Sequence, residues 1–303
     1  ATTMGAVGWM AGGRWLHVAQ IDGLADDDAR AVAIDHRGQP WFGTAFFDQT
    51  FFNGHSSLWW DGGLSCLVDP DANRLFFGTR TWRNTGDAAS GVLGPVADLV
   101  ADPRDGIWLA TGTAYQDRSK VEGGIYHVDS DGHWTFFVDP GHPTDSVQSL
   151  AFDAEDSLWM EGENGIVVRR GDGSWPASLE GGRPLGSFSE MAVSAGGDAV
   201  WLAGNEGRTL FRRKGGAWLD VDLPSGLTVA PHTMAVDPPG NLWFASETYA
   251  GVRWKEGALQ IFPRGEGLGA GYIERIWRDR IGDIWVNQWT KALGEGLTRL
   301  RCR

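Results

Sequence analysis

The sequence predicts an all-β fold, a β-propeller of six four-stranded antiparallel blades. Glycine, with 44 of 303 residues, is about twice as frequent as its usual ~7%, which indicates many tight turns. Tryptophan, with 17 residues, far outnumbers tyrosine, with 4. A segment built around tryptophan also recurs along the chain, and its last three intervals are 42 residues each. A period of ~40 to 45 residues with four strands per repeat is typical of a propeller.

Each repeat is an apolar strand that ends in Asp, a short turn, and then Trp followed by small or apolar residues. The six clearest copies lie at 31–44, 98–111, 149–162, 191–204, 234–246 and 275–288. Their anchor residues are Trp41, Trp108, Trp159, Trp201, Trp243 and Trp285. A second hairpin follows, with Asp-Gly or Gly-Gly pairs that supply the positive φ angles of tight hairpin turns. A blade therefore has strands A to D in chain order.

The two ends of the chain are expected to complete one blade. The last copy stops after its third strand, at 296–303, and the missing fourth strand is the segment 12–20. Pairing of the two terminal strands would remove an open sheet edge, which otherwise favours aggregation. We therefore expect residues 1–303 to form a single propeller domain.

The number of blades depends on the interval of 67 residues between Trp41 and Trp108. Residues 58–70 align with 125–140 as a second hairpin, which leaves 70–94 as an insertion and gives six blades. The alternative treats 73–79 as the second strand of a further blade and gives seven blades.

These repeats resemble the two-component regulator propeller repeat, in which Asp-x-x-Gly-x-Ile/Leu-Trp-x-Gly-Thr follows a strand. The closest copies are 34–44 and 276–300. The resemblance implies a periplasmic sensor-type domain that binds carbohydrate or another small ligand. The copy at 231–247 is also similar to a repeat of the streptogramin B lyase family, but the catalytic Glu-x-His pairing of that family is absent from this chain.

Three long connections are expected on the top face, where strand A begins and strand B ends. They are the inserted loops 45–56, 70–94 and 112–123, which are rich in aromatic residues. Loops on a rigid scaffold often carry binding residues. From these loops we select as ligand-binding candidates Phe46, Phe51, Trp82 and Tyr115. The alternative is that the aromatic side chains pack on each other as a small separate core.

Two columns of the repeat alignment predict the residues at the mouth of the central channel. Five positions before the strand-A Asp, or its Ser194 equivalent, are Arg30, Ala97, Gln148, Ser189, His232 and Glu274. Four positions after the anchor Trp are Ala45, Gly112, Glu163, Asn205, Glu247 and Trp289. The ligand-binding candidates among them are Arg30, Gln148, Glu163 and Trp289. Converging polar groups beside aromatic rings are the usual sign of a binding site, but opposite charges here could equally form a structural ring of ion pairs.

A catalytic reading rests on His232. If Asp237 lies opposite Leu242, then His232 lies opposite Glu247, and a carboxylate beside an imidazole raises the histidine pKa and can exchange protons with it. With Glu274 these residues would form the centre of a lyase or hydrolase. The alternative is an ordinary hydrogen-bonded histidine at a strand end.

Composition excludes several classes of protein. The net charge of −13 argues against nucleic-acid binding, and no apolar run approaches the ~18 residues of a membrane span. The chain contains no HExxH, GxSxG or Walker motif, and its two cysteines, Cys66 and Cys302, form no zinc motif, although they could form one disulfide. Together with the resemblance described above, this leads us to expect a periplasmic or secreted monomer that binds a small molecule or glycan. The sequence assigns no metal-binding residues, and it identifies neither a cofactor nor a metal dependence.

Deleting residues 1–20 tests the predicted closure. The truncated chain would lose the fourth strand of the last blade and the Trp15 side chain, which should lower the free energy of unfolding by about 3–5 kcal/mol. Chemical denaturation of the two proteins measures this difference. An unchanged unfolding midpoint would exclude the terminal pairing.

Overall fold

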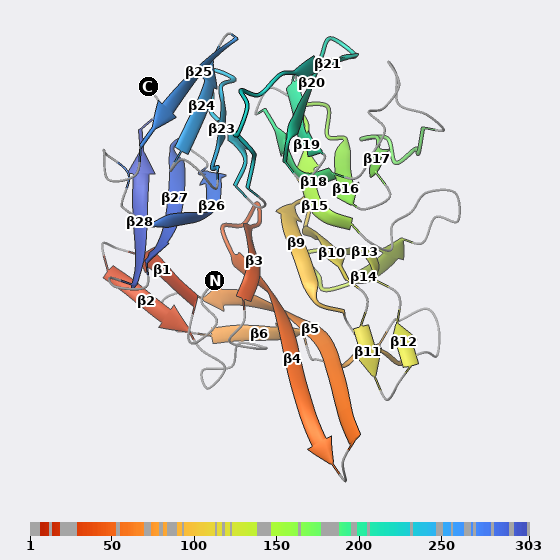
Figure 1. Cartoon of the computed structure of the whole chain (residues 1–303). Coiled ribbons are helices and arrows are strands. Elements are labelled where there is room, and N and C mark those ends of the chain that lie inside the picture. Colours follow the sequence, from red (N-terminus) through yellow and green to blue (C-terminus); the bar gives the residue numbers. More distant parts are fainter. Residues whose placement is uncertain are drawn as a thin grey trace. The chain divides into compact units, whose positions relative to one another are not determined.

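The computed structural model is all-β, with strands β1 to β28 and no helix among its described residues (Figure 1). The structure describes residues 7–11, 14–18, 29–52, 55–69, 74–78, 81–83, 90–92, 94–112, 114–116, 119–121, 123–137, 147–162, 165–176, 188–194, 199–204, 207–230, 233–246, 251–255, 257–263, 268, 271–279, 282–290 and 294–301.

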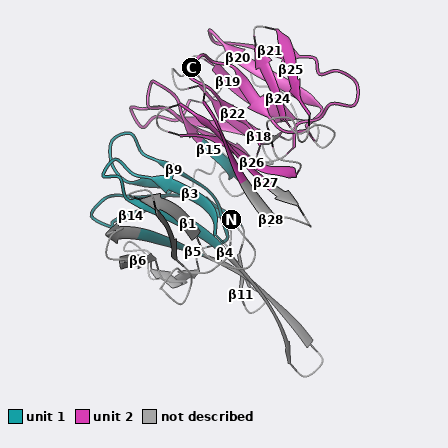
Figure 2. Cartoon of the chain, turned by 90° about the vertical axis from the view of Figure 1, so that its left-hand side faces the viewer, with its two compact units in different colours: residues 1–150 teal, residues 151–303 magenta. Residues whose placement is uncertain are grey.

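The chain divides into two compact units, residues 1–150 and 151–303 (Figure 2). In each unit, the larger antiparallel sheets have their first two strands joined by the predicted Asp-turn-Trp segment, with Ser194 in place of the Asp in one copy. The prediction of one propeller domain over 1–303 stays a prediction.

Unit 1 contains two large sheets and two small ones. The first large sheet has the order β12-β11-β5-β4-β3, and β6 also pairs with β5; its strands are β3 (Ala29–Ile34), β4 (Pro40–Phe52), β5 (His55–Asp69), β6 (Arg74–Gly78), β11 (Ala114–Gln116) and β12 (Ser119–Val121). The second has the order β14-β13-β10-β9, with β9 (Val96–Ala101), β10 (Ile107–Thr111), β13 (Gly124–Val128) and β14 (Trp134–Phe137). The small sheets pair β1 (Val7–Ala11) with β2 (Arg14–Val18) and β7 (Thr81–Arg83) with β8 (Ser90–Val92).

The first blade corrects the alignment made from sequence. Residues 58–70 were expected to form a hairpin, but 55–69 is the single strand β5. The segment 45–56, expected as a loop, is the end of a long β4–β5 hairpin in which Phe46 lies opposite Asp61. The other two expected loops, 70–94 and 112–123, also contain short strands. The physical reason is that aromatic and β-branched residues favour extended backbone when a neighbouring strand supplies hydrogen bonds.

The strand β6 bears on the number of blades. It lies within 73–79, the segment that the seven-blade alternative made the second strand of its own blade. Instead, β6 pairs with β5, with Leu64 opposite Gly78 and Leu67 opposite Leu75. It therefore adds a fourth strand to the first blade.

Four sheets follow, beginning with β15 at the boundary of the two units. The first has the order β15-β16-β17, with β15 (Val147–Phe152), β16 (Leu158–Gly162) and β17 (Gly165–Arg169). The second comprises β18 (Phe188–Val193), β19 (Ala199–Gly204), β20 (Thr209–Lys214) and β21 (Ala217–Val221). The third comprises β22 (Ala235–Val236), β23 (Leu242–Phe244), β24 (Gly251–Lys255) and β25 (Ala258–Phe262). The last comprises β26 (Tyr272–Arg278), β27 (Ile284–Thr290) and β28 (Gly294–Leu300).

The described blades thus have three or four strands rather than four throughout. The segment 12–20 contains β2, which pairs with β1, and β28 pairs with β27. The predicted pairing of 12–20 with 296–302 is not among the described strand pairs and stays a prediction. Cys66 is a free, buried thiol, and burial raises its pKa to about 12. Cys302 lies outside the described residues.

The described core lies between consecutive sheets within each unit, and four of the anchor tryptophans contribute to it. Trp159 packs with Phe188 and Leu202 of the next sheet, and the fully buried Trp201 packs with Leu242 and Phe244 of the sheet after that. Trp243, like Trp41 in unit 1, follows the same rule. Burial of one large side chain stabilises a fold by about 1.5–3 kcal/mol, so these tryptophans are major contributors.

A hydrogen bond from five of the six anchors to the strand-A Asp fixes the indole. In these five copies the indole Nε1 donates to Oδ2 of the Asp six residues earlier, at 2.6–3.0 Å. The five tryptophans are Trp41, Trp108, Trp159, Trp243 and Trp285. The other carboxylate oxygen accepts backbone N–H groups of the turn, as Asp153 Oδ1 does from Glu155 and Ser157, both at 2.9 Å. We call this arrangement the Asp–Trp turn. The carboxylate accepts the hydrogen bonds of the backbone N–H groups in the turn and orients the indole at the same time.

The fourth copy departs from this rule. Ser194 replaces the Asp, and its Oγ accepts the Ala199 N–H at 3.1 Å. Trp201 lies seven residues after Ser194, and its Nε1 is buried with no hydrogen-bond partner in the described part of the chain.

Replacing Asp237 tests the Asp–Trp turn. This fully buried carboxylate accepts hydrogen bonds from Asn241, Trp243 and Arg253, so Asp237→Ala leaves several buried donors unpaired. We expect unfolding free energy to fall by about 3–5 kcal/mol, measured by urea denaturation. Asp220→Ala, at an exposed carboxylate of β21, is the matched control and should change it little. Equal losses in the two variants would contradict the assignment.

Candidate functional site

A β-bulge lies near the start of strand A in four described blades. Ala29 pairs with Thr44 and Ala31 with Gly43, so Arg30 is the extra residue on β3. The strand pairings skip three residues in the same way, and these are Ala97, Ser189 and Glu274. All four belong to the column that the sequence alignment placed at the channel mouth.

This bulge gives that column a physical basis. A bulge leaves one residue out of the ladder and redirects its side chain, and bulges often lie next to functional sites. Arg30 and Glu274, two predicted site residues, are both exposed. The bulged ends are therefore the candidate functional site.

The most complete described part of this site lies on β26 and β27 in unit 2. Glu274 accepts a hydrogen bond of 3.5 Å from Asn287 Nδ2 on the neighbouring strand. Tyr272, two residues earlier, is 58% exposed, and its backbone lies opposite that of Trp289. The site thus offers a carboxylate, an amide and an exposed aromatic ring on one blade. The sequence analysis missed Tyr272, because its exposure depends on which side of β26 faces solvent.

Polar side chains near the bulged ends form hydrogen bonds that hold the neighbouring strands together. In unit 1, Thr44 and Thr111 donate their hydroxyls to the Gly63 and Gly124 carbonyls, each at 3.3 Å. Asp98 Oδ2, next to the bulge residue Ala97, accepts the Leu150 N–H of the following strand A at 2.8 Å. Gln288 in unit 2 accepts a hydrogen bond from Thr298 at 3.3 Å and is almost fully buried.

The other predicted site residues are less fully described. Gln148 lies half-buried on β15. His232, Glu247 and Glu163 lie outside the described residues. For Trp289, on β27, the structure describes the backbone alone. The same holds for the four candidates expected in loops, which lie on strands instead: Phe46 and Phe51 on β4, Trp82 on β7 and Tyr115 on β11.

The register assumed for His232 is wrong by one residue. The structure pairs Ala235 with Trp243 and Val236 with Leu242, so Asp237 lies opposite Asn241 rather than Leu242. The reason is a three-residue loop that ends in Gly240 at φ 88°, a favoured hairpin geometry. The prediction that His232 lies opposite Glu247 was based on the assumed register, so the observed register does not support it.

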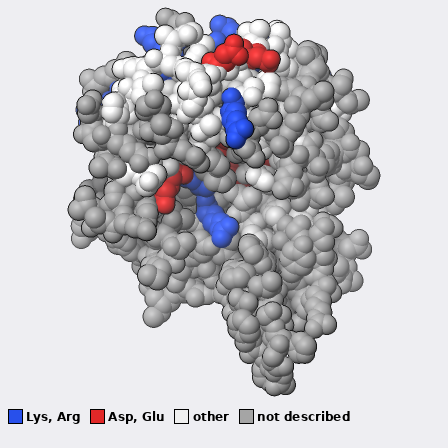
Figure 3. All heavy atoms as spheres, in the orientation of Figure 1, with Lys and Arg blue, Asp and Glu red and all other residues white. Residues whose placement is uncertain are grey.

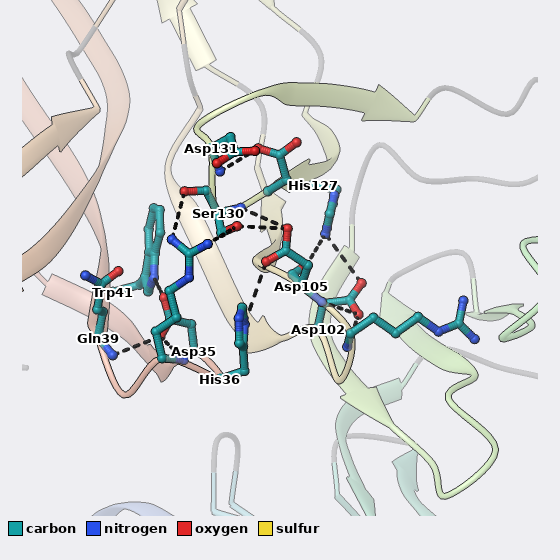
Figure 4. A network of polar contacts seen from close by, with 12 residues as sticks. Asp35, His36, Gln39, Trp41, Asp102, Asp105, His127, Ser130 and Asp131 are labelled. Atoms are coloured by element: carbon teal, nitrogen blue, oxygen red, sulfur yellow. Dashed lines mark hydrogen bonds and ion pairs between the residues drawn. The ribbon is translucent and has the colours of Figure 1, made fainter.

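At the other end of the strands, three turns of unit 1 form a polar network (Figure 4). Arg37 donates to Ser130 Oγ at 2.7 Å, and Ser130 donates its N–H and hydroxyl to Asp105 at 3.2 and 3.1 Å. His36 Nδ1 lies 3.7 Å from Asp105 Oδ1. The network joins turns from two adjacent sheets, and sequence reasoning missed it because each residue belongs to a separate turn.

Next to this network, Asp102 contacts the side chains of Trp108 and His127. Burial raises its pKa, but hydrogen bonds from His127, Trp108 and the Arg104 N–H outweigh burial and lower it to about 2. His127 Nε2 lies 3.4 Å from Asp102 Oδ2 and 2.8 Å from the Asp105 carbonyl oxygen. These contacts hold a turn together, so we interpret this end of unit 1 as structural.

The sheets and repeated Asp–Trp turns define a propeller-type β fold, and comparison with solved structures agrees. Virginiamycin B lyase from Staphylococcus aureus has a TM-score of 0.59 at 14% identity, with 91% of this chain and 85% of that chain covered. A streptogramin B lyase structure has a TM-score of 0.61 at 16% identity, with coverage of 93% and 86%. At such identities the similarity is one of fold.

A second group of similar structures consists of extracellular domains. The extracellular domain of a putative hybrid two component system from B. thetaiotaomicron has a TM-score of 0.54 at 18% identity, and the match covers 90% of this chain and 38% of that chain. No family model matches the sequence, and no curated protein does.

The described part of the chain holds no helix long and apolar enough to cross a membrane. It also holds no group of three or more His, Cys, Asp or Glu side chains able to bind a metal ion.

The lowered pKa of Asp102 predicts an acid-sensitive stability. A carboxyl whose folded-state pKa is below its unfolded value stabilises the fold above pH ~4 and loses that contribution as the pH falls to about 2. The contribution is on the order of 2 kcal/mol. Denaturation of the native protein and Asp102→Asn from pH 6 to 2 measures it: the difference in unfolding free energy should shrink as the pH falls. A constant difference would contradict the assignment.

Proposed function

We propose that this chain is a recognition propeller that binds a small molecule or carbohydrate at the top mouth of its central channel, in the periplasm or outside the cell. One observation carries the proposal: the bulges coincide with the predicted mouth residues, two of which are Arg30 and Glu274. The similarity in fold to the extracellular domain of a two component system protein supports the location and the sensing role.

The proposal includes a ring of six blades closed within residues 1–303. The exposure of Val32 supports closure. Three residues before the Asp of each Asp–Trp turn, or Ser194, the side chains of Leu99, Leu150, Met191, Met234 and Ile276 are 4–6% exposed, but Val32 is 58% exposed. In the other blades, the sheet that precedes in the chain covers this apolar side chain. The sheet that contains β3 is the first large sheet, so Val32 would be covered only if the ring closes and the last sheet packs against β3.

The ligand chemistry follows from the groups on β26 and β27. A sugar ring can stack on the exposed Tyr272, and its hydroxyls can bond to Glu274 and Asn287. A carboxylate also attracts an amine, and the chain carries an excess of acidic residues. The ligand we expect is therefore neutral or cationic.

An enzyme is the second candidate, favoured by the similarity in fold to streptogramin B lyases. Its centre would be His232 with Glu247 and Glu274. The alternative needs turnover, whereas recognition needs only binding. Incubation with cyclic depsipeptides and glycans separates the two, and a product that disappears in His232→Ala would establish the enzyme in place of the recognition protein.

Replacing Glu274 tests the site. Calorimetric titration with a panel of neutral and amine-bearing glycans should identify a ligand, and Glu274→Ala should weaken it by tenfold or more, the effect of a lost hydrogen bond to a charged group, roughly 1.5–3 kcal/mol. Thermal unfolding should not change. Glu155→Ala, at an exposed turn carboxylate, is the control. Loss of stability with binding intact would show instead that the mouth is a structural ring of ion pairs.

A further inference from the structure

The two units carry different charge. Unit 1 contains 9 Lys and Arg against 19 Asp and Glu, whereas unit 2 contains 17 against 20. The formal charges are therefore −10 and −3. Most of the cations of this acidic chain belong to unit 2, and their positions follow the repeat.

One basic residue occupies the same position in all four sheets of unit 2. The chain carries an exposed cation at the end of the third strand of each sheet or directly after it, two residues after the residue opposite the anchor Trp. We call these four residues the hairpin cations; they are Arg170, Lys214, Lys255 and Arg301. The corresponding residues of unit 1 are Val68 and Asp129. The pattern is therefore specific to unit 2.

Four carboxylates at this end of the sheets are hydrogen-bonded within their own sheets. Asp153, Asp237 and Asp279 accept hydrogen bonds from anchor tryptophans, and Asp283 bonds to Arg299 at 2.7 Å. Two exposed carboxylates remain in the described turns. They are Glu155 and Asp172, of which Asp172 faces Arg170. Cations thus predominate among the solvent-facing charges at these hairpins.

A second row of guanidinium groups lies behind the hairpin cations. Arg212, Arg253 and Arg299 stack on the anchor Trp of their own sheets, with 5.1–5.4 Å between the guanidinium carbon and the ring centroid. Stacking holds these side chains in place. Figure 3 shows basic side chains, with some acidic ones, at its upper edge, where the ends of β20 and β25 lie in Figure 1.

The spacing of these cations indicates the form of the partner. Sheets packed face to face are about 10 Å apart, so one phosphate or carboxylate cannot contact two hairpin cations at once. The partner must repeat its negative charge over several blades. In the described part of the second hairpins, the tips offer no large apolar side chain for insertion into a membrane; they consist of glycines such as Gly173, Gly216 and Gly257, which have positive φ angles, with serine, alanine and charged residues.

We infer that the hairpin cations of unit 2 bind a linear polyanion, of the class of acidic polysaccharides. This surface lies at the end of the strands opposite the bulges, because β26 begins next to Glu274 and runs toward the turn at Asp279. It is therefore separate from the proposed ligand site and does not depend on it.

Dextran sulfate is the probe, with neutral dextran as the blank. At low ionic strength the full chain should bind dextran sulfate and release it as salt is added, because screening weakens exposed charges beyond a Debye length of ~10 Å at 0.1 M salt. The variant Lys214→Ser with Lys255→Ser should bind about tenfold more weakly, since attraction to a polyanion depends on the number of neutralised charges. The melting temperature should not change, because both lysines are exposed.

The matched control removes two other exposed cations, Arg104→Ser with Arg208→Ser, and so makes the same change in net charge. This variant should bind dextran sulfate as the native chain does. Equal weakening in both double variants, or no binding by the native chain, would overturn the proposal. Binding to phosphatidylserine vesicles without binding to dextran sulfate would also overturn it, in favour of a membrane surface.

Discussion

The hydrogen bond between an Asp carboxylate and the indole of a Trp six residues later is the interaction on which the rest of this structure depends. It satisfies the backbone of the first turn in a blade and points a large apolar side chain at the next sheet. One short segment therefore determines both the local hairpin and the contact between blades. Where Ser194 replaces the Asp, Trp201 keeps its place through packing alone, and its indole N–H has no partner among the described residues.

The sequence was informative where structure is local. The Asp and Trp of each repeat lie close together in the chain, so their spacing alone predicted the strands, the turns and the column of residues at the strand ends. It did not predict bulges, because a bulge is a relation between two strands. It also misplaced the register at Asp237 by one residue. The sequence fits a loop of four residues as well as the observed loop of three, in which Gly240 adopts a positive φ angle.

The parts that could not be predicted depend on contacts between repeats. Residues 55–69 look like a hairpin in isolation because Gly62 and Gly63 suggest a turn, yet pairing with the long β4 keeps them extended. The network of Arg37, Ser130 and Asp105 brings together three turns that are far apart in the chain. Of the candidate site, Arg30 and Glu274 followed from alignment, whereas Tyr272 required knowledge of which side of β26 faces solvent.

The short span of the Asp–Trp turn also has a consequence for the order of folding. A contact between residues six apart costs little loop-closure entropy, and hairpins of this size form in about 1–10 μs. Each first hairpin can therefore form before its neighbours are in place and present its indole to whichever sheet arrives next. Assembly can then proceed blade by blade along the chain as it leaves the ribosome, and the slow steps will be those that join residues far apart in sequence.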